Sequence, residues 1–229
     1  MRVKCATLLH ENPVFSKADF DTLDNLISLA RQKEYSVNSI LTLEGDVWPY
    51  LFYVHKGKLV VMKESSEGRA LSISEVKKGE LFWGPAFFED KLPNPVTLRF
   101  AVPSRLLLWT RDAILPILLK NGEITWELSR LMMDRMIMAS DLISGLAFQP
   151  VAGRLANLLI SFTSEAEPGP ISRTFTLDDM AMRIGSTREV VCRFLQNFAE
   201  RGYISVTRTE LEIMDREQLL LLAQKERMR

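Results

Sequence analysis

Cysteine and histidine are scarce in this chain, and their scarcity excludes several kinds of site. Among the 229 residues there are two Cys, Cys5 and Cys192, and two His, His10 and His55. Two distant Cys cannot build a disulfide framework, an all-Cys zinc site or an iron–sulfur cluster within one chain. Such cysteine usage is typical of a reducing compartment, so we expect a cytoplasmic protein.

Long apolar runs and an excess of charge of one sign are missing as well. Arg105, Arg111 and Asp112 bracket the longest apolar stretches, so no run reaches membrane-spanning length and no membrane partner is expected. The N-terminus, MRVKCATLLHENP, is too short and turns acidic too soon for a signal peptide. Lys plus Arg equals Asp plus Glu at 29 each, so the field of the whole chain predicts no polyanionic partner.

No catalytic arrangement is visible in the sequence. There is no nucleophile–base pair, no metal triad and no phosphate-binding loop, and neither His has an acid placed to orient it. We therefore expect neither an enzyme nor a metal site. The apolar fraction of 47% is that of a globular protein, and 229 residues leave room for one large domain or two smaller ones.

The first half of the chain predicts a short helix followed by many short strands, that is, an α+β fold. The helix spans 14–33, opens with Ser16 and Asp19 as a capping pattern, and has an apolar face of Phe20, Leu23, Leu26, Ile27 and Ala30. Runs rich in Val, Leu, Ile and aromatics follow, separated by turn residues, at 39–43, 50–55, 58–63, 70–76, 96–102 and 105–110. Such spacing indicates an antiparallel barrel or roll.

Two helices follow, at 112–121 and 123–148, and the second is apolar on two sides. Its residues recur at alternating spacings of four and three, which predicts a dimer seam of Met132, Met136, Ala139, Ile143 and Leu146. One side of the helix can lie on the roll and the other on a second copy of the chain, so we predict a homodimer. The alternative is a helix buried within one domain. The Met residues of this helix are interpreted as adaptable core residues, in preference to haem or metal ligands.

Pro150 interrupts that helix and marks a domain boundary, because proline disfavours helix at the residue before it and fits the first turn of a new helix. We predict a sensor domain over 1–121, a dimerisation helix over 122–148 and a further domain over 149–229. The segment 145–150 is the candidate hinge between them. A helix at 151–163 and a loop at 164–173 open the last domain.

The last domain contains two short helices joined by a tight turn, within 176–201. Thr176 and Asp179 form a capping box, Gly185 permits the turn, and Ser186 or Thr187 caps the second helix. From Arg173 to Arg208 six Arg stand against four acids. A hairpin over 203–214 and a helix over 215–225 follow. This order is typical of a winged helix-turn-helix that reads DNA, and an ordinary helical hairpin is the alternative.

The chain resembles the cyclic-AMP receptor protein and fumarate-nitrate regulator (Crp-Fnr) superfamily of bacterial transcription factors over nearly its whole length. The stretch LFYVHKGKLVVMKESSEGRALSISEVKKGELF is similar to the family's cyclic-nucleotide-binding-like jelly roll. GLAFQPVAGRLANLLISF resembles its dimer-helix end and hinge, and FTLDDMAMRIGSTREVVCRFLQNFAERGYISV resembles its helix-turn-helix. The resemblance implies a homodimer that binds double-stranded DNA, with RNA polymerase as a further partner.

The resemblance also assigns DNA-contacting roles. It implies that Arg188, Glu189 and Arg193 read bases in a palindromic site with half-sites like TGTGA, and Arg–guanine and Glu–cytosine pairs fit that role chemically. Residues implied at the DNA backbone are Thr176, Ser186, Thr187, Cys192, Thr207 and Arg208. Cys192 is additionally a candidate for direct oxidant sensing, against the simpler reading of a small helix residue.

The sensor half departs from the family's cyclic-nucleotide pattern. By resemblance, the ribose-binding Glu position falls on Gly84, the phosphate-binding Arg-Ser pair on Asn94 and Pro95, and the adenine-contacting Thr-Ser pair on Ala139 and Ser140. Without a cation or those donors, cyclic AMP binding is not expected. Haem is not expected either, because an axial ligand would have to come from His10, His55, Cys5 or a Met. No cofactor is predicted, and the effector is unknown.

An apolar effector pocket remains open as a hypothesis, against the simpler reading that the same aromatic residues fill the roll. Trp83, Phe87, Phe88 and Trp109, with the Met-rich helix face, would line it. The full set of effector-pocket candidates is Trp83, Gly84, Phe87, Phe88, Asn94, Met136, Ala139 and Ser140. A constitutively active regulator without an effector fits the sequence equally well. An alternative function is a small-molecule or haem sensor of the same fold whose helix pair contacts a protein.

Overall fold

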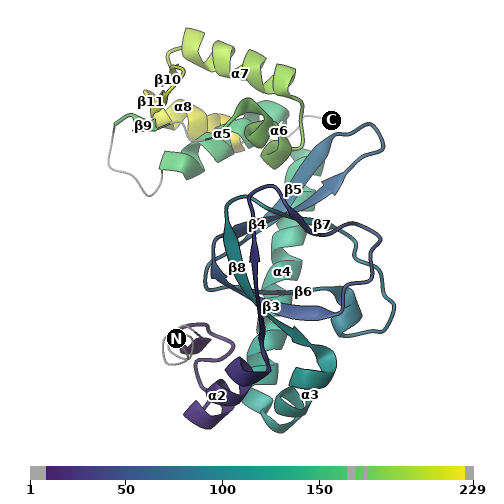
Figure 1. Ribbon diagram of the computed structural model, residues 1–229. Coiled ribbons are helices and arrows are strands. Elements are labelled where there is room, and N and C mark those ends of the chain that lie inside the picture. The colour runs from purple at the N-terminus through teal and green to yellow at the C-terminus, as the bar shows by residue number, and fades with distance from the viewer. Residues whose placement is uncertain (1–8, 164–168, 173–174, 225–229) are drawn as a thin grey trace. The chain divides into compact units, whose positions relative to one another are not determined.

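The computed structural model describes residues 9–163, 169–172 and 175–224 (Figure 1). Cys5, Lys225 and most of the predicted loop at 164–173 lie outside these residues. The chain divides into two compact units, one of 1–63 with 73–138 and one of 64–72 with 139–229. The predicted division at 121 and 148 stays a prediction.

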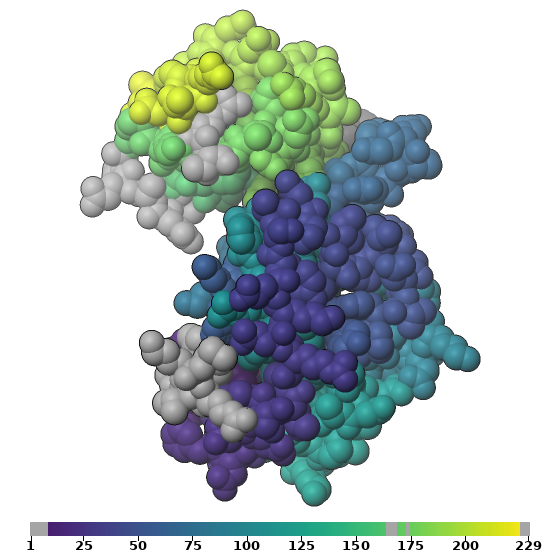
Figure 2. Space-filling view, viewed as in Figure 1, coloured from purple at the N-terminus to yellow at the C-terminus, as the bar shows by residue number. Residues whose placement is uncertain are grey.

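The first unit contains two four-stranded sheets, with strand orders β1-β8-β3-β6 and β2-β7-β4-β5. The strands are β1 (Arg31–Tyr35), β2 (Ile40–Thr42), β3 (Tyr50–Lys56), β4 (Lys58–Glu64), β5 (Ala70–Lys77), β6 (Leu81–Trp83), β7 (Thr97–Phe100) and β8 (Ser104–Thr110). All six predicted strands are present to within two residues at each end. The sequence reading missed β1 and β6. In Figure 2 the violet and blue segments, which include β1 to β4, form much of the visible face of this unit.

Apolar side chains fill the roll from both sheets. One cluster lies between strands and includes Phe52, Val54, Leu59, Val61, Leu98, Phe100 and Leu106. A second cluster joins the roll to helices α2 (Phe20–Leu29), α3 (Arg111–Lys120) and α4 (Gly122–Phe148), and Figure 1 shows α2 and α3 at the same end of the roll. Trp109 anchors this cluster, and its indole N–H donates to the Leu26 carbonyl at 2.7 Å. The short 3-10 helix η1 (Pro85–Phe87) follows β6.

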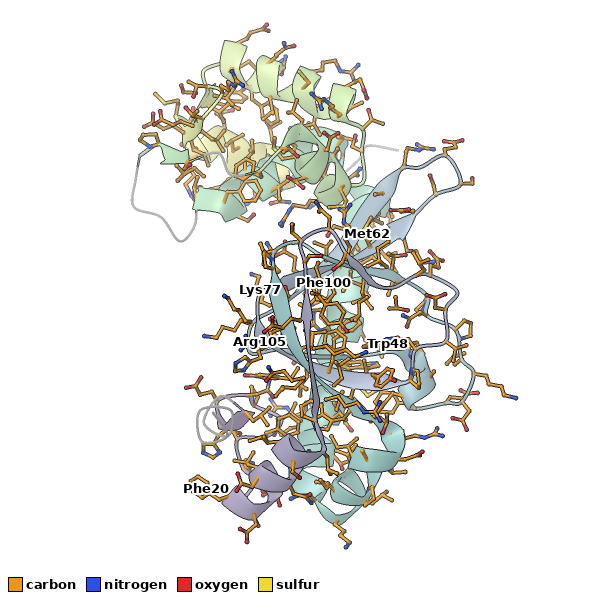
Figure 3. The ribbon with its side chains drawn as sticks, viewed as in Figure 1. Phe20, Trp48, Met62, Lys77, Phe100 and Arg105 are labelled. Atoms are coloured by element: carbon orange, nitrogen blue, oxygen red, sulfur yellow. The ribbon has the colours of Figure 1, made fainter. Side chains whose placement is uncertain are left out.

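The predicted helix at 14–33 is wrong at both ends. Asp19, not Ser16, is the N-cap, since its carboxylate accepts from the Thr22 N–H at 2.7 Å, whereas the Ser16 hydroxyl donates to Pro13 within a turn. Residues 31–35 form β1 instead of a last helical turn. Phe20 was expected to face inward, but as the first helical residue it lies beyond the core and is 82% exposed (Figure 3).

Helix α4 buries Ile124 and Leu128 in the roll core and leaves an apolar flank uncovered. The uncovered residues are Trp126, Met132, Met133, Met136, Ile137, Met138, Ile143 and Phe148. Of the predicted seam, Met132, Met136 and Ile143 are exposed, while Ala139 and Leu146 are half-buried.

No helix in the described part of the chain is long and apolar enough to span a membrane.

The second unit has a core built from four helices, with a small sheet beside them. It contains α5 (Val151–Thr163), β9 (Ile171–Ser172), α6 (Leu177–Ile184), α7 (Arg188–Glu200), β10 (Ile204–Val206), β11 (Glu210–Ile213) and α8 (Arg216–Gln224). Its core is built from Leu155, Leu159, Met180, Ile184, Val191, Leu195, Phe198 and Leu219. The predicted helices and hairpin are present, and β9 adds an unforeseen third strand in the order β10-β11-β9.

Candidate nucleic-acid interface

The α6–turn–α7 segment is held by local hydrogen bonds that the sequence predicted. Thr176 caps α6, and its hydroxyl accepts from the Asp179 N–H at 3.1 Å while Asp179 accepts from the Thr176 N–H at 2.9 Å. Gly185 ends α6 in the left-handed region at φ 59°, where a side chain would be strained. Thr187, rather than Ser186, is the N-cap of α7. The position of Arg188 as the first residue of α7 is therefore fixed.

The three predicted base-reading residues lie on the exposed side of α7. Val191, Leu195 and Phe198 bury the opposite side. Arg188, Glu189 and Arg193 are exposed, and Cys192 is half-buried beside them. The pKa of Glu189 is lowered because its own backbone N–H and the Thr187 hydroxyl donate to the carboxylate. Glu189 is thus ionised at neutral pH and acts only as a hydrogen-bond acceptor.

An ion pair that the sequence did not indicate joins the two helices. Arg188 Nη1 donates to Asp178 Oδ2 at 3.0 Å, across ten residues of sequence, and both side chains are largely exposed. Asp178 lies in the first turn of α6. The first turns of α6 and α7 are therefore neighbours on one surface.

Three of the residues predicted at the DNA backbone also hold local structure, and Thr187 does so as the N-cap of α7. The Thr176 hydroxyl contacts Asp179 Oδ2 at 2.8 Å, and the Thr207 hydroxyl accepts from the Thr209 and Glu210 amides at 3.3 and 3.0 Å. Thr207 therefore builds the wing turn between β10 and β11. Arg208 at the tip of that turn is exposed, while Ser186 and Thr187 are half-buried at the start of α7. Their phosphate contacts stay a prediction.

Arg154 is a positioning residue that the sequence reading missed. Its Nε donates to the Ile184 carbonyl at 2.8 Å, and its Nη1 donates to the Gln149 carbonyl at 2.7 Å. Arg154 thus links the end of α6 to the segment before α5. The motif around Pro150 marked this region as a hinge but gave no sign of which side chain would bridge it.

The eight candidate effector residues differ in burial, and the pocket they were assigned to stays a prediction. Phe87 is buried in the same cluster as Trp109, so both fill the roll, as the simpler reading expected. Trp83 is half-buried against that cluster, whereas Phe88, Met136 and Ser140 are exposed and Ala139 is half-buried. Local sequence pattern does not distinguish a core aromatic residue from one that lines a pocket, since both are apolar at the same spacing.

Gly84 and Asn94 both have structural roles in the loops where they lie. A Cβ at Gly84 would lie 1.9 Å from the carbonyl oxygen of Trp48, so no side chain fits there. Asn94 is buried, and its amide donates to the Thr42 hydroxyl at 3.0 Å while its backbone pairs with Gly45 and Asp46. Asn94 therefore closes the loop after β2.

Two domain families match the chain where these features lie. Residues 153–222 match the Crp-like helix-turn-helix domain, and residues 32–121 match the cyclic nucleotide-binding domain. The chain belongs to the Crp-Fnr superfamily. It is a member of a family of DNA-binding transcription regulators, as its sequence predicted, with the α+β roll and winged helix-turn-helix of that family.

Relatives of this Crp-Fnr protein are similar over most of their length. The cAMP-activated global transcriptional regulator Vfr of Pseudomonas aeruginosa is 24% identical over 80% of this chain and 89% of its own. The cAMP-activated global transcriptional regulator CRP of Salmonella typhimurium is 23% identical over 80% of this chain and 90% of its own. A Crp/Fnr-family regulator of Eubacterium rectale has the same fold, with 20% identity, a TM-score of 0.74 and coverage of 93% and 98%.

The Crp-Fnr roll of this chain also carries a half-buried cation that no sequence motif indicated. The side chain of Arg135, on α4, is 16% exposed, and its Nη2 contacts Glu80 Oε2 at 3.2 Å. Its guanidinium lies 5.6 Å from the centre of the Phe82 ring. A salt bridge and a cation–π contact thus hold α4 to the turn before β6. The partners are 55 positions apart in the sequence, which explains why no local motif revealed the pair.

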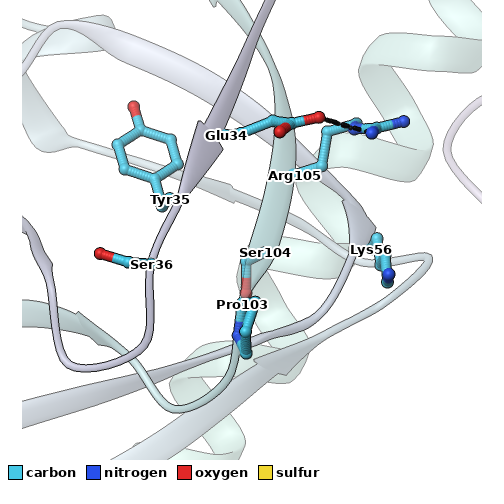
Figure 4. Close-up of a pocket in the computed structure, with 7 residues that line it drawn as sticks. All are labelled: Glu34, Tyr35, Ser36, Lys56, Pro103, Ser104 and Arg105. Carbon is cyan, nitrogen blue, oxygen red and sulfur yellow. Dashed lines mark hydrogen bonds and ion pairs between the residues drawn. The ribbon is translucent and has the colours of Figure 1, made fainter.

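An open cleft of about 330 Å³ lies elsewhere on the roll, and its lining is polar (Figure 4). It is lined by Glu34, Tyr35, Ser36, Lys56, Pro103, Ser104 and Arg105. Figure 4 shows the Glu34–Arg105 ion pair at one side and Lys56 at another. None of the eight predicted effector residues lines this cleft.

Burial, Arg105 and Lys78 together lower the pKa of the neighbouring His55, which is therefore neutral at pH 7.

Proposed function

We propose that the protein is a homodimeric, sequence-specific transcription regulator that reads a palindromic DNA site with α7 and has no working cyclic-nucleotide pocket. The observation that carries this proposal is the exposed set Arg188, Glu189 and Arg193 on the first two turns of a helix whose other side is buried. Arg can donate to both acceptors of guanine, and Glu can accept from cytosine. Half-sites like TGTGA match that donor and acceptor set.

The dimer interface is assigned to the uncovered apolar flank of α4. Met133, Met136 and Ile137 are all more than half exposed there, which is unusual for a helix in a folded monomer. A second copy of α4 packed on this flank would cover it and set two reading helices about a two-fold axis. Family membership supports the same arrangement, and RNA polymerase is the expected partner of the DNA-bound dimer. Such a regulator acts on the chromosome in the cytoplasm.

Met136→Lys is expected to dissociate this dimer, because two copies of the new charge would meet at the two-fold seam. Met136 is 67% exposed in the monomer, so the substitution leaves the fold intact. Sedimentation at micromolar concentration should change from dimer to monomer. Asp134→Lys, which places the same side chain outside the predicted seam of Met132, Met136, Ala139, Ile143 and Leu146, should remain dimeric. If Met136→Lys stays dimeric, the interface lies elsewhere.

The sensor of this chain is proposed not to bind cyclic AMP, although Vfr and CRP are named for activation by it. Gly84 cannot hold a carboxylate-bearing side chain, and Asn94 is committed to its own loop. A cyclic nucleotide would therefore lack both the ribose contact and the phosphate contact that the family resemblance assigns to these positions. No apolar effector is favoured by the positions of the candidate residues.

The decisive experiment is binding of the purified protein to a palindromic duplex with TGTGA-like half-sites, with and without millimolar cyclic AMP. We expect binding that is sequence-specific, falls steeply with salt because phosphates release counterions, and does not change with cyclic AMP. Titration calorimetry with cyclic AMP alone should give no heat of binding. A tightening of tenfold or more with cyclic AMP would refute the degenerate pocket, and absence of any specific duplex would refute the reading role.

A further inference from the structure

Asp178 is held against Arg188 by rigid local geometry. The capping box at Thr176 fixes the first turn of α6, the left-handed Gly185 fixes the turn, and Thr187 fixes the start of α7. Within that frame Arg188 Nη1 and Asp178 Oδ2 are 3.0 Å apart. Asp179, the other acid of the turn, is used by the capping box, so Asp178 is not needed to cap α6.

The contact places an anion where a DNA base would have to bind. A guanidinium that reads guanine donates two N–H groups to O6 and N7, and an Asp carboxylate oxygen is a stronger acceptor of the same kind. The pair is exposed, with side-chain exposures of 60% for Arg188 and 65% for Asp178, so water and DNA can both reach it. A carboxylate on this surface also faces a polyanion when DNA arrives.

We propose that Asp178 is a built-in competitor for Arg188, which holds the reading guanidinium in the free protein and lowers the affinity of the dimer for DNA. The inference rests on the proposed base-reading role of Arg188. Binding then exchanges the Asp178 contact for contacts to a base, and only a base with matching acceptors compensates fully for the lost ion pair. Asp178 thereby makes binding weaker overall and more dependent on the correct base.

The size of the effect follows from the exposure of the pair. Ion pairs between exposed side chains contribute little in water, so their loss changes an equilibrium only a few-fold. We expect Asp178→Asn to tighten binding to the specific duplex by about two- to fivefold per half-site. The removal of any acid near DNA also tightens binding in general, so a single variant does not test the proposal.

A double-mutant cycle separates the two causes. The Kd of the full chain for the specific duplex is measured for wild type, Asp178→Asn, Arg188→Ala and the double variant, at fixed salt and with thermal melts to verify folding. Glu200→Gln, which removes one negative charge from the exposed end of α7, is the matched control. With Arg188 present, we expect Asp178→Asn to tighten DNA binding more than Glu200→Gln does. In the Arg188→Ala background, we expect the two substitutions to tighten binding equally.

The outcomes are distinct. Equal tightening by Asp178→Asn in both backgrounds would show general electrostatics and overturn the competitor role. Weaker specific binding after Asp178→Asn would show that Asp178 instead supports Arg188 in its reading position, which also overturns it. In both cases Arg188→Ala alone still weakens binding, and the proposed function stands. If Arg188→Ala binds the specific duplex as tightly as wild type does, the base-reading role of Arg188 is refuted, and the competitor role of Asp178 is refuted with it.

Discussion

Arg193→Ala is expected to weaken binding to the specific duplex by about 1–3 kcal/mol, roughly five- to 150-fold, because one bidentate Arg–base contact is worth that much discrimination. Arg193 is exposed, and its guanidinium lies 5.6 Å from the ring of the adjacent Phe194. That ring is half-buried against the domain core. The guanidinium of Arg193 therefore rests beside a fixed ring on an exposed surface, from which it can reach the major groove.

The measurement is a set of competition assays against duplexes that each carry one symmetric base-pair change. Wild type should discriminate at every position of the half-site, and Arg193→Ala should lose discrimination at one of them. Arg201→Ala removes the same charge from the other end of α7 and should weaken all duplexes slightly and equally. A uniform loss for Arg193→Ala across all duplexes would assign Arg193 to the DNA backbone.

The DNA end of the molecule could be predicted from sequence because its signals are local. The capping box of Thr176 and Asp179, the left-handed Gly185 and the cap at Thr187 all act within four residues. The apolar spacing of α7 then decides which side is buried. Each of these features is readable in order along the chain, and the structure has all of them.

Features that depend on distant partners could not be predicted in this way. Strand β1 has four exposed residues and no apolar alternation, and only its pairing with β8 makes it a strand. The Arg188–Asp178 and Arg135–Glu80 ion pairs join residues ten and 55 apart. The aromatic residues of the roll posed a similar problem, because hydrophobic spacing predicts burial but does not distinguish a packed core at Phe87 from a pocket wall.

Gly84→Ala is expected to destabilise the first unit by about 3 kcal/mol or more, since overpacking against backbone is harder to relieve than contact with a flexible side chain. The new Cβ would lie 1.9 Å from the Trp48 carbonyl oxygen and 3.0 Å from its carbonyl carbon. The Gly84 N–H donates to the Tyr50 carbonyl at 3.0 Å, and β6 pairs with β3 directly before it. The segments around Trp48 and Gly84 therefore cannot separate without breaking the pairing of β6 with β3.

Urea unfolding of the full chain tests this, with Gly122→Ala as the control. Gly122 begins α4 with nothing within 4 Å of an added Cβ, so alanine there should leave the free energy of unfolding unchanged or raise it. Gly84→Glu should destabilise at least as much as Gly84→Ala and should not create cyclic AMP binding, because the carboxylate cannot enter without displacing Trp48. If Gly84→Ala is as stable as wild type, the segment around Trp48 can move to admit a side chain. The steric argument against a nucleotide pocket at Gly84 would then be refuted.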